Sequence, residues 1–176
     1  MENKWLTTTD FIWCAGCPSN WLAVTLAQIF DELDLERENT WMVSGIGCTG
    51  RMASYFTCST AHTTHGRAIP VAEGIKTARQ DRDVFVVSGD GDLLSIGLNH
   101  LIHAARRNIN LKVVCVNNAV FGMTGGQTSP TTELDSPTKT HPLGSPYQPL
   151  SPEQLFKAFP KAYFETIKVY DPEFKN

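Results

Sequence analysis

The sequence has no long uninterrupted hydrophobic run and no cluster of basic residues. The polar stretch Thr7–Asp10 lacks the apolar core of a signal peptide, and no later run is long enough to span a bilayer. Because the fifteen Lys and Arg residues are scattered and the formal net charge is -3, we expect no surface suited to nucleic acid or to an anionic membrane. We therefore expect a cytoplasmic protein whose partners are small ligands and other proteins.

Cysteine is scarce, with five residues among 176, and no internal repeat is visible. In a reducing compartment these cysteines are not expected to form a disulfide framework, and the spacing Cys14-x-x-Cys17 is more typical of a metal, cluster or redox element. A chain of this length with 41% hydrophobic residues can bury one core. We therefore expect a single domain over residues 1–176.

Helix-like and strand-like patterns alternate along the chain. Hydrophobic residues recur at helical spacing after Pro18, and later apolar runs lack the polar alternation of a half-exposed strand. Such runs are typical of parallel strands covered on both faces, so we expect an α/β fold with a doubly wound parallel sheet. The expected helices are 18–33, 70–79 and 98–107, and the expected strands are 40–46, 84–87 and 111–116.

The last third of the chain has a different character. Residues 125–150 are rich in Thr, Ser, Pro and Gly, which predicts an extended loop able to close over a site or pack on a partner. Ser151 and the residues after it have capping-box spacing and predict a short helix through Phe159. A last strand is expected over residues 166–170.

Two polar motifs follow neighbouring strands of the predicted sheet. Gly89-Asp90-Gly91-Asp92 follows one strand, and Asn117-Asn118 follows the next after one intervening helix. Because ligands gather beyond the carboxyl ends of parallel strands, we expect these motifs to lie side by side. A carboxylate next to an amide oxygen suits Mg²⁺. Each motif alone is also typical of a plain turn or strand end, but their joint spacing favours a site.

This pair of motifs resembles the signature of thiamine-diphosphate enzymes, in which Gly-Asp-Gly precedes Asn-Asn by one helix and one strand. The resemblance implies that Asp90 and Asn118 bind Mg²⁺ through their side chains and that Val120 binds it through its carbonyl oxygen. It narrows to the beta subunits of 2-oxoacid:ferredoxin oxidoreductases, similar over residues 13–132. The segments that carry it are 13–17, 44–48, 62–67, 89–92, 99–108 and 121–127.

The resemblance also implies further contacts to the cofactor. His65 would donate to the diphosphate, although a histidine in a loop is by itself more often a capping or structural residue. His100 and His103 lie on a predicted helix and are assigned no chemistry. The other residues expected to line the cofactor are Ile46, Gly47, Cys48, Thr49, Gly91, Asp92, Gly122 and Met123.

Three cysteines match ligands of the [4Fe-4S] cluster of this family, namely Cys14, Cys17 and Cys48. The family's fourth cysteine lies far downstream and has no counterpart here, since residues 151–176 form a shortened C-terminal segment. The Gly-rich turn of the family after its second cysteine is replaced by a segment starting at Pro18. Cys115 falls inside an apolar strand and is expected to be a buried small hydrophobic residue.

By the same resemblance, the activity is the coenzyme A-dependent oxidative decarboxylation of a 2-oxo acid, with electrons passed to ferredoxin. The glutamate that activates the cofactor belongs to an alpha subunit, fused to or separate from a gamma subunit, which carries the pyrimidine-binding domain. No catalytic residue is therefore expected on this chain. The segment 122–132 resembles the 2-oxoglutarate type most, then the branched-chain type, then the pyruvate type.

Two other classes of function stay open. Loss of the C-terminal segment would leave a non-catalytic remnant or binding module that keeps the fold. Alternatively, the cysteines would hold zinc or a labile cluster in a small metal or Fe–S module without thiamine chemistry.

Overall fold

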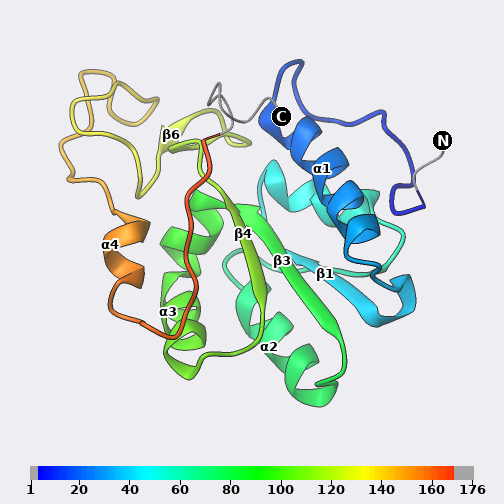
Figure 1. The fold of residues 1–176 in the computed structure, drawn as a ribbon. Helices are drawn as coiled ribbons and strands as arrows, with labels where there is room; N and C mark the ends of the chain where they lie inside the picture. Colours follow the sequence, from blue (N-terminus) through cyan, green and yellow to red (C-terminus); the bar gives the residue numbers. More distant parts are fainter. Residues whose placement is uncertain (1–3, 169–176) are drawn as a thin grey trace.

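A four-stranded parallel sheet forms the centre of the computed structural model, which describes residues 4–168 (Figure 1). Its strands are β1 (Thr40–Ser44), β2 (Ser59–His62), β3 (Asp83–Gly89) and β4 (Lys112–Val116), in the order β2-β1-β3-β4. Each neighbouring pair runs parallel. The three strands expected from the sequence are all present, and the parallel α/β sheet is confirmed.

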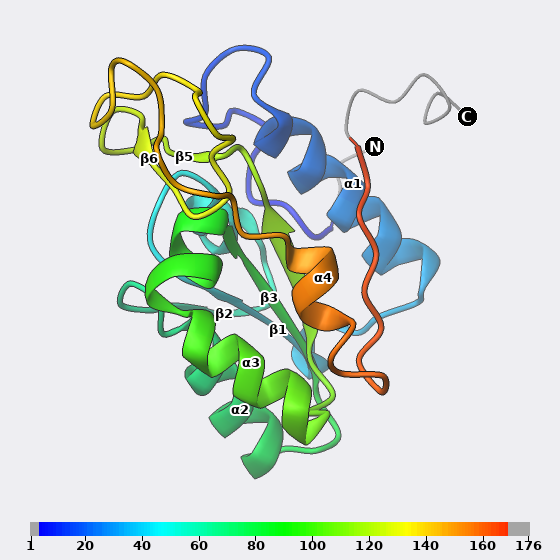
Figure 2. The same cartoon turned by 90° about the vertical axis from the view of Figure 1, so that its left-hand side faces the viewer.

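Helices cover both faces of this sheet (Figure 2). Because successive side chains of a strand point to opposite faces, Phe85 and Val87 belong to one core and Val84 and Val86 to the other. The first core includes residues of α1 (Pro18–Glu32) and of the 3-10 helix η2 (Thr49–Tyr55). The second includes residues of α2 (Ala68–Ala78) and α3 (Leu98–Arg107). The sheet is therefore doubly wound, as expected.

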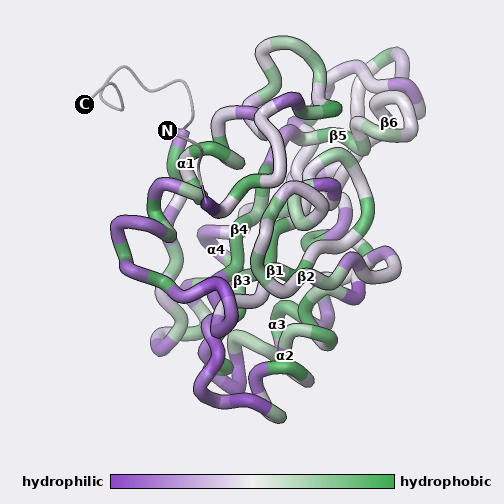
Figure 3. Tube along the Cα trace, turned by 90° about the vertical axis from the view of Figure 1, so that its right-hand side faces the viewer, coloured by the Kyte–Doolittle hydropathy of each residue, from purple (hydrophilic) through white to green (hydrophobic). Residues whose placement is uncertain are grey.

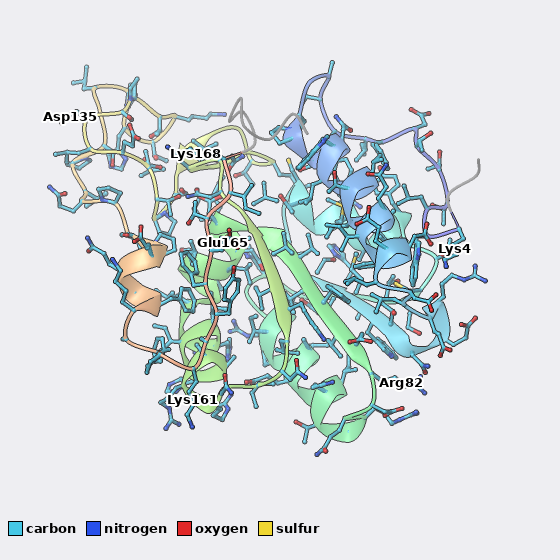
Figure 4. All side chains as sticks on the ribbon, in the orientation of Figure 1. Lys4, Arg82, Asp135, Lys161, Glu165 and Lys168 are labelled. Atoms are coloured by element: carbon cyan, nitrogen blue, oxygen red, sulfur yellow. The ribbon has the colours of Figure 1, made fainter. Side chains whose placement is uncertain are left out.

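Hydrophobic residues are concentrated in the central strands, and hydrophilic residues in the outer loops (Figure 3). Lys4, Arg82, Asp135 and Lys161 lie at the outer rim of the molecule (Figure 4). The densest part of the first core is aromatic: the ring of Phe30, which is 0% exposed, lies 5.0 Å from Trp5, 5.6 Å from Phe56 and 4.5 Å from Phe85 between centroids.

Short elements were not predicted. These are β2, the 3-10 helix η1 (Arg37–Asn39) and the antiparallel pair β5 (Val120–Phe121) and β6 (Gln127–Thr128). Apart from β6, residues 125–150 contain no helix or strand. The short helix expected after Ser151 is α4 (Pro152–Phe156), and the Ser151 hydroxyl accepts a hydrogen bond from Gln154 N at 3.3 Å.

Two predictions in this region need comment. Residues 166–168 are not in a strand, and the rest of the strand expected over 166–170 lies outside the described residues. The prediction of a buried Cys115 is wrong, because β4 is an edge strand and Cys115 is exposed on it.

Within residues 4–168, none of the helices combines the length and the apolar character that crossing a membrane requires.

The aromatic core predicts a large effect of removing its central ring. Replacing Phe30 with Ala leaves a cavity among three other rings, so the free energy of unfolding should fall by about 3–5 kcal/mol. The matched control is Tyr163→Ala, since Tyr163 is 87% exposed, and its effect should stay within about 0.5 kcal/mol. Urea unfolding followed by fluorescence measures both, and equal shifts would contradict this packing.

Candidate functional site

The polar motifs meet at the carboxyl ends of β1, β3 and β4. From β1 the chain continues to β2 on one side, and from β2 it returns through α2 to β3 on the other side. The loops that leave β1 and β3 therefore diverge and open a crevice between them, the usual ligand position in a doubly wound sheet. The segment between β4 and α4 lies over this end of the sheet (Figure 1).

Asp92 is the buried centre of this crevice and is 2% exposed. Its Oδ1 accepts hydrogen bonds from Ile46 N at 3.1 Å and Gly66 N at 2.7 Å, and it lies 2.7 Å from His65 Nδ1. Its Oδ2 accepts from the Ser88 hydroxyl at 3.0 Å. Because both oxygens are engaged within the protein, the Asp92 carboxylate positions other groups, and any cofactor contact of this residue is left to its backbone.

The close approach of Asp92 to β1 requires glycine at position 45. A Cβ atom on Gly45 would lie 1.9 Å from Asp92 Oδ2, which no packing tolerates. Asp92 lies in the first turn of a π-helix, η3 (Gly91–Ile96). At the end of this helix, Gly97 N donates to Asp92 O at 2.9 Å. Such turns occur frequently at functional sites.

His65 faces the crevice with one nitrogen fixed. Its Nδ1 faces Asp92 Oδ1, which already accepts from two backbone N–H groups, so Nδ1 is the donor and Nε2 is the nitrogen left for a ligand. The side chain is 34% exposed, and its ring meets the ring of Phe121 edge-on at 6.3 Å between centroids. The structure thus orients the histidine that the sequence singled out.

A second group of polar atoms gathers around the Asn118 side chain. Asp90 is 1% exposed, and its Oδ1 lies 3.0 Å from the Asn118 side-chain oxygen, which also lies 2.8 Å from the carbonyl oxygen of Val120. Acceptors facing one another need either a reversed amide, which would donate to both neighbours, or a cation between them. Neighbouring oxygens around octahedral Mg²⁺ are about 2.9 Å apart for metal–oxygen distances near 2.0–2.1 Å. The residues present therefore fit a hard divalent cation.

The three N-terminal cysteines named by the sequence lie in one neighbourhood. Cys17 N donates to Cys14 O at 3.0 Å just before α1, and Trp13 Nε1 donates to Cys48 O at 2.6 Å. Burial raises the pKa of the Cys48 thiol, and the nearby Cys17 and Cys14 thiols raise it further. A Cβ on Gly122 would lie 3.9 Å from Cys48 Sγ, so this cysteine also borders the crevice. Over residues 4–168, no three His, Cys, Asp or Glu side chains are grouped to hold a single metal ion.

The remaining expected cofactor contacts lie around the same crevice. Ile46, Gly47 and Cys48 are half-buried in the loop after β1, and Thr49 is buried at the start of η2. Gly91 passes directly under the Phe121 ring. Gly122 and Met123 lie in the turn between β5 and β6, and Met123 is 47% exposed. The contacts of these residues to a cofactor stay predictions.

The sequence did not reveal the two hydroxyl groups that bond to the carboxylates of the site. Ser88 bonds to Asp92 and Thr131 bonds to Asp90, and no role was predicted for either residue, although Thr131 lies in the segment 122–132 that resembles the 2-oxoglutarate type. Serine at the end of a buried strand and threonine in a Thr-rich loop are common for local reasons. Only the folded chain pairs these hydroxyls with the two carboxylates.

Comparison with known proteins identifies the family of the chain. Residues 36–175 match the family model of the thiamine pyrophosphate enzymes, C-terminal TPP binding domain. The chain belongs to this family. The resemblance to the beta subunits of 2-oxoacid:ferredoxin oxidoreductases is also confirmed. For this family member, the crevice with Asp90 and Asn118 is the candidate thiamine-diphosphate site.

The similar proteins share a common description. The 2-oxoglutarate synthase subunit KorB of Archaeoglobus fulgidus is 46% identical over 92% of this chain and 60% of its own length. The 2-oxoglutarate oxidoreductase subunit KorB of Mycobacterium tuberculosis is 48% identical over 81% of this chain and 38% of its own length. The solved 2-oxoglutarate:ferredoxin oxidoreductase of Magnetococcus marinus, with 2-oxoglutarate, coenzyme A and succinyl-CoA bound, superimposes with a TM-score of 0.86 at 36% identity.

The superposition with the Magnetococcus marinus structure covers 90% of this chain and 56% of the solved chain. The chain of this family member thus spans between about 38% and 60% of the length of these relatives.

The buried network predicts that Asp92 cannot be replaced by its amide. Asp92→Asn can keep an oxygen toward the N–H groups of Ile46 and Gly66, but it then places its NH2 group against the Ser88 hydroxyl and loses the charge that strengthens these bonds, so the free energy of unfolding should fall by about 1–3 kcal/mol. Asp81→Asn, at a carboxylate 58% exposed, is the matched control and should change it by less than about 0.5 kcal/mol. Urea unfolding of the purified chain measures both, and a silent Asp92→Asn would contradict the network.

Proposed function

We propose that this chain is the diphosphate-binding and Mg²⁺-binding subunit of a 2-oxoacid:ferredoxin oxidoreductase, with 2-oxoglutarate as the favoured 2-oxo acid. One observation carries the proposal: the side chains of Asp90 and Asn118 and the carbonyl oxygen of Val120 come together at the edge of the sheet. The names of the relatives support the substrate, since those that are 46–49% identical over the aligned residues are named as 2-oxoglutarate enzymes. Residues 1–176 would act as one thiamine-diphosphate-binding domain.

In this proposal each part of the crevice has its own role. Asp90, Asn118 and Val120 would hold Mg²⁺, whose open positions take diphosphate oxygens. His65 Nε2 would face the diphosphate, since Nδ1 is fixed by Asp92. When bound, thiamine diphosphate supplies the electron sink for oxidative decarboxylation of a 2-oxo acid.

The activity would require partners. Asn118 and Met123 at the crevice are exposed, so this side of the proposed site is open to a partner. We infer that an alpha subunit covers this side, brings the pyrimidine-binding domain and supplies the activating glutamate. Coenzyme A would accept the acyl group, and ferredoxin would accept the electrons. The residues of this chain would then bind and orient the cofactor, and proton transfer to it would fall to the partner.

Removing the carboxylate of the proposed metal site tests this function. In the complex purified with the alpha subunit, Asp90→Ala should weaken Mg²⁺ binding measured calorimetrically at fixed thiamine diphosphate by more than about 100-fold, because a charged ligand is lost. Asp81→Ala removes an exposed carboxylate and should leave binding unchanged. Decarboxylation of 2-oxoglutarate, a branched-chain 2-oxo acid and pyruvate by the same complex ranks the substrates.

Equal Mg²⁺ affinity in Asp90→Ala and the wild type would reject the metal assignment. A wild-type complex that binds neither Mg²⁺ nor thiamine diphosphate would favour a non-catalytic module that keeps the fold.

We further propose that Cys14, Cys17 and Cys48 bind an iron–sulfur cluster beside the crevice. The support is their shared neighbourhood, since Cys17 N bonds to Cys14 O and the adjacent Trp13 side chain bonds to Cys48 O. Thiolates are the ligands that such clusters prefer. The fourth ligand has not been located among the described residues.

Anaerobic purification of the complex with iron and sulfide analysis tests the cluster. We expect iron and sulfide in matching amounts, lost in Cys48→Ser because a thiolate ligand is removed. The matched control Cys115→Ser changes an exposed cysteine on β4 and should keep both. Stoichiometric zinc without sulfide would contradict the cluster and favour a simple cysteine metal site.

A further inference from the structure

Three hydroxyl side chains from the long loop are buried beside the proposed metal site. Ser129, Thr131 and Thr132 are 5%, 7% and 4% exposed, although the loop has almost no regular structure around them. Exposed fractions this low are unusual for loop threonines, which commonly face water. Regular secondary structure therefore does not explain the burial of the segment Ser129–Thr132, and its side-chain contacts must do so.

Hydrogen bonds within the segment fix its shape. Ser129 N donates to Thr132 Oγ1 at 2.9 Å, Thr132 N donates to Ser129 O at 3.2 Å, and Thr131 N donates to Ser129 Oγ at 3.3 Å. From the far end of the loop, Leu150 N donates to Pro130 O at 2.7 Å. The segment is thus a rigid turn, which we call the 129–132 turn, and it presents two threonine hydroxyls in set directions.

Both hydroxyls reach the residues of the proposed metal site. Thr131 Oγ1 lies 2.9 Å from Asp90 Oδ2 and 2.7 Å from Asn117 Oδ1, and Thr132 Oγ1 donates to the carbonyl of Ala119 at 2.6 Å. The single Thr131 proton faces two acceptors, the Asp90 carboxyl oxygen and the Asn117 amide oxygen. The 129–132 turn therefore grips both Asp90 and the loop that carries Asn118.

These contacts give the two oxygens of Asp90 separate roles. Oδ2 is held by Thr131, and Oδ1 faces the side chain of Asn118, which in turn faces the carbonyl oxygen of Val120. Without the Thr131 hydroxyl, the carboxylate could turn about its Cβ–Cγ bond and lose this direction. Thr132 in turn secures Ala119, whose φ of 58° sets the backbone between the other two oxygens.

We propose that Thr131 is a positioning residue for the metal, acting through Asp90, and that the 129–132 turn couples the long loop to metal affinity. The inference rests on the proposed magnesium site. Thr131 would touch neither metal nor cofactor, since its hydroxyl is used by Asp90 and Asn117. Partners that orient a ligand in this way typically change metal affinity by about 10–100-fold when removed.

The test compares Thr131→Val with Thr131→Ser in the complex with the alpha subunit. Valine keeps the volume and removes the hydroxyl, so the Mg²⁺ concentration for half-saturation at fixed thiamine diphosphate should rise about 10–100-fold. Serine keeps the hydroxyl and should stay close to the wild type. The control Thr140→Val removes an exposed hydroxyl from the same loop, bonded to Thr128, and should not change the Mg²⁺ midpoint.

Excess Mg²⁺ separates positioning from a general loss of structure. If Thr131 acts through the metal ligand, saturating Mg²⁺ restores kcat of Thr131→Val to within about twofold of the wild type. Direct Mn²⁺ binding, followed by electron paramagnetic resonance, should show the same shift without any turnover.

Asp90→Ala distinguishes a failure of the proposed metal site from a failure of the positioning role of Thr131. Lost metal binding in Asp90→Ala together with an unchanged midpoint in Thr131→Val overturns the role of Thr131 and keeps the site. Unchanged binding in both variants overturns both. Equal weakening in Thr131→Val and Thr131→Ser overturns the role of the hydroxyl.

Discussion

The carboxylate of Asp92 holds the crevice together. It is buried, and it links the loop after β1, the loop that carries His65 and the end of β3 through hydrogen bonds to Ile46, Gly66 and Ser88. A buried carboxylate is stable only when its oxygens accept hydrogen bonds. If these three segments separated, Asp92 would lose its donors while still buried, which is energetically unfavourable. The direction of the free nitrogen of His65, and the shape of the crevice above it, follow from this one constraint.

Asp90 and Asp92 are two residues apart in one motif, and their surroundings decide their opposite roles. Asp92 meets donors on both oxygens, so the protein alone satisfies it. Asp90 meets one donor, Thr131, at Oδ2, and at Oδ1 it meets the side-chain oxygen of Asn118, which is an acceptor unless the amide is reversed. An acidic group facing further acceptors is completed by a cation, whereas one facing donors needs nothing more. The same motif thus builds both the support of the site and its proposed ligand.

The sequence predicted the elements with strong periodicity and the motifs at their ends. Long apolar strands such as β3 are recognisable because both their faces are buried, and Asp90 and Asn118 were placed by the length of chain between them. The short strand β2 was missed because its sequence, Ser59 to His62, has few residues that favour strands. Cys115 was misplaced because a sequence does not reveal which strand lies at the edge of the sheet.

The loop between β6 and α4 shows why the support of the site was harder to foresee than its ligands. Its Ser, Thr, Pro and Gly residues are typical of any irregular connection, since short polar side chains bond readily to nearby backbone. Here those local bonds shape the 129–132 turn, and the two hydroxyls left over point at Asp90 and Ala119. Composition predicts the loop, but only the long-range contact gives it a role, because the partner of each hydroxyl lies in another part of the chain. The loop is held in place by the same residues that it supports. Loss of these contacts should therefore disorder the loop and weaken the proposed metal site at the same time.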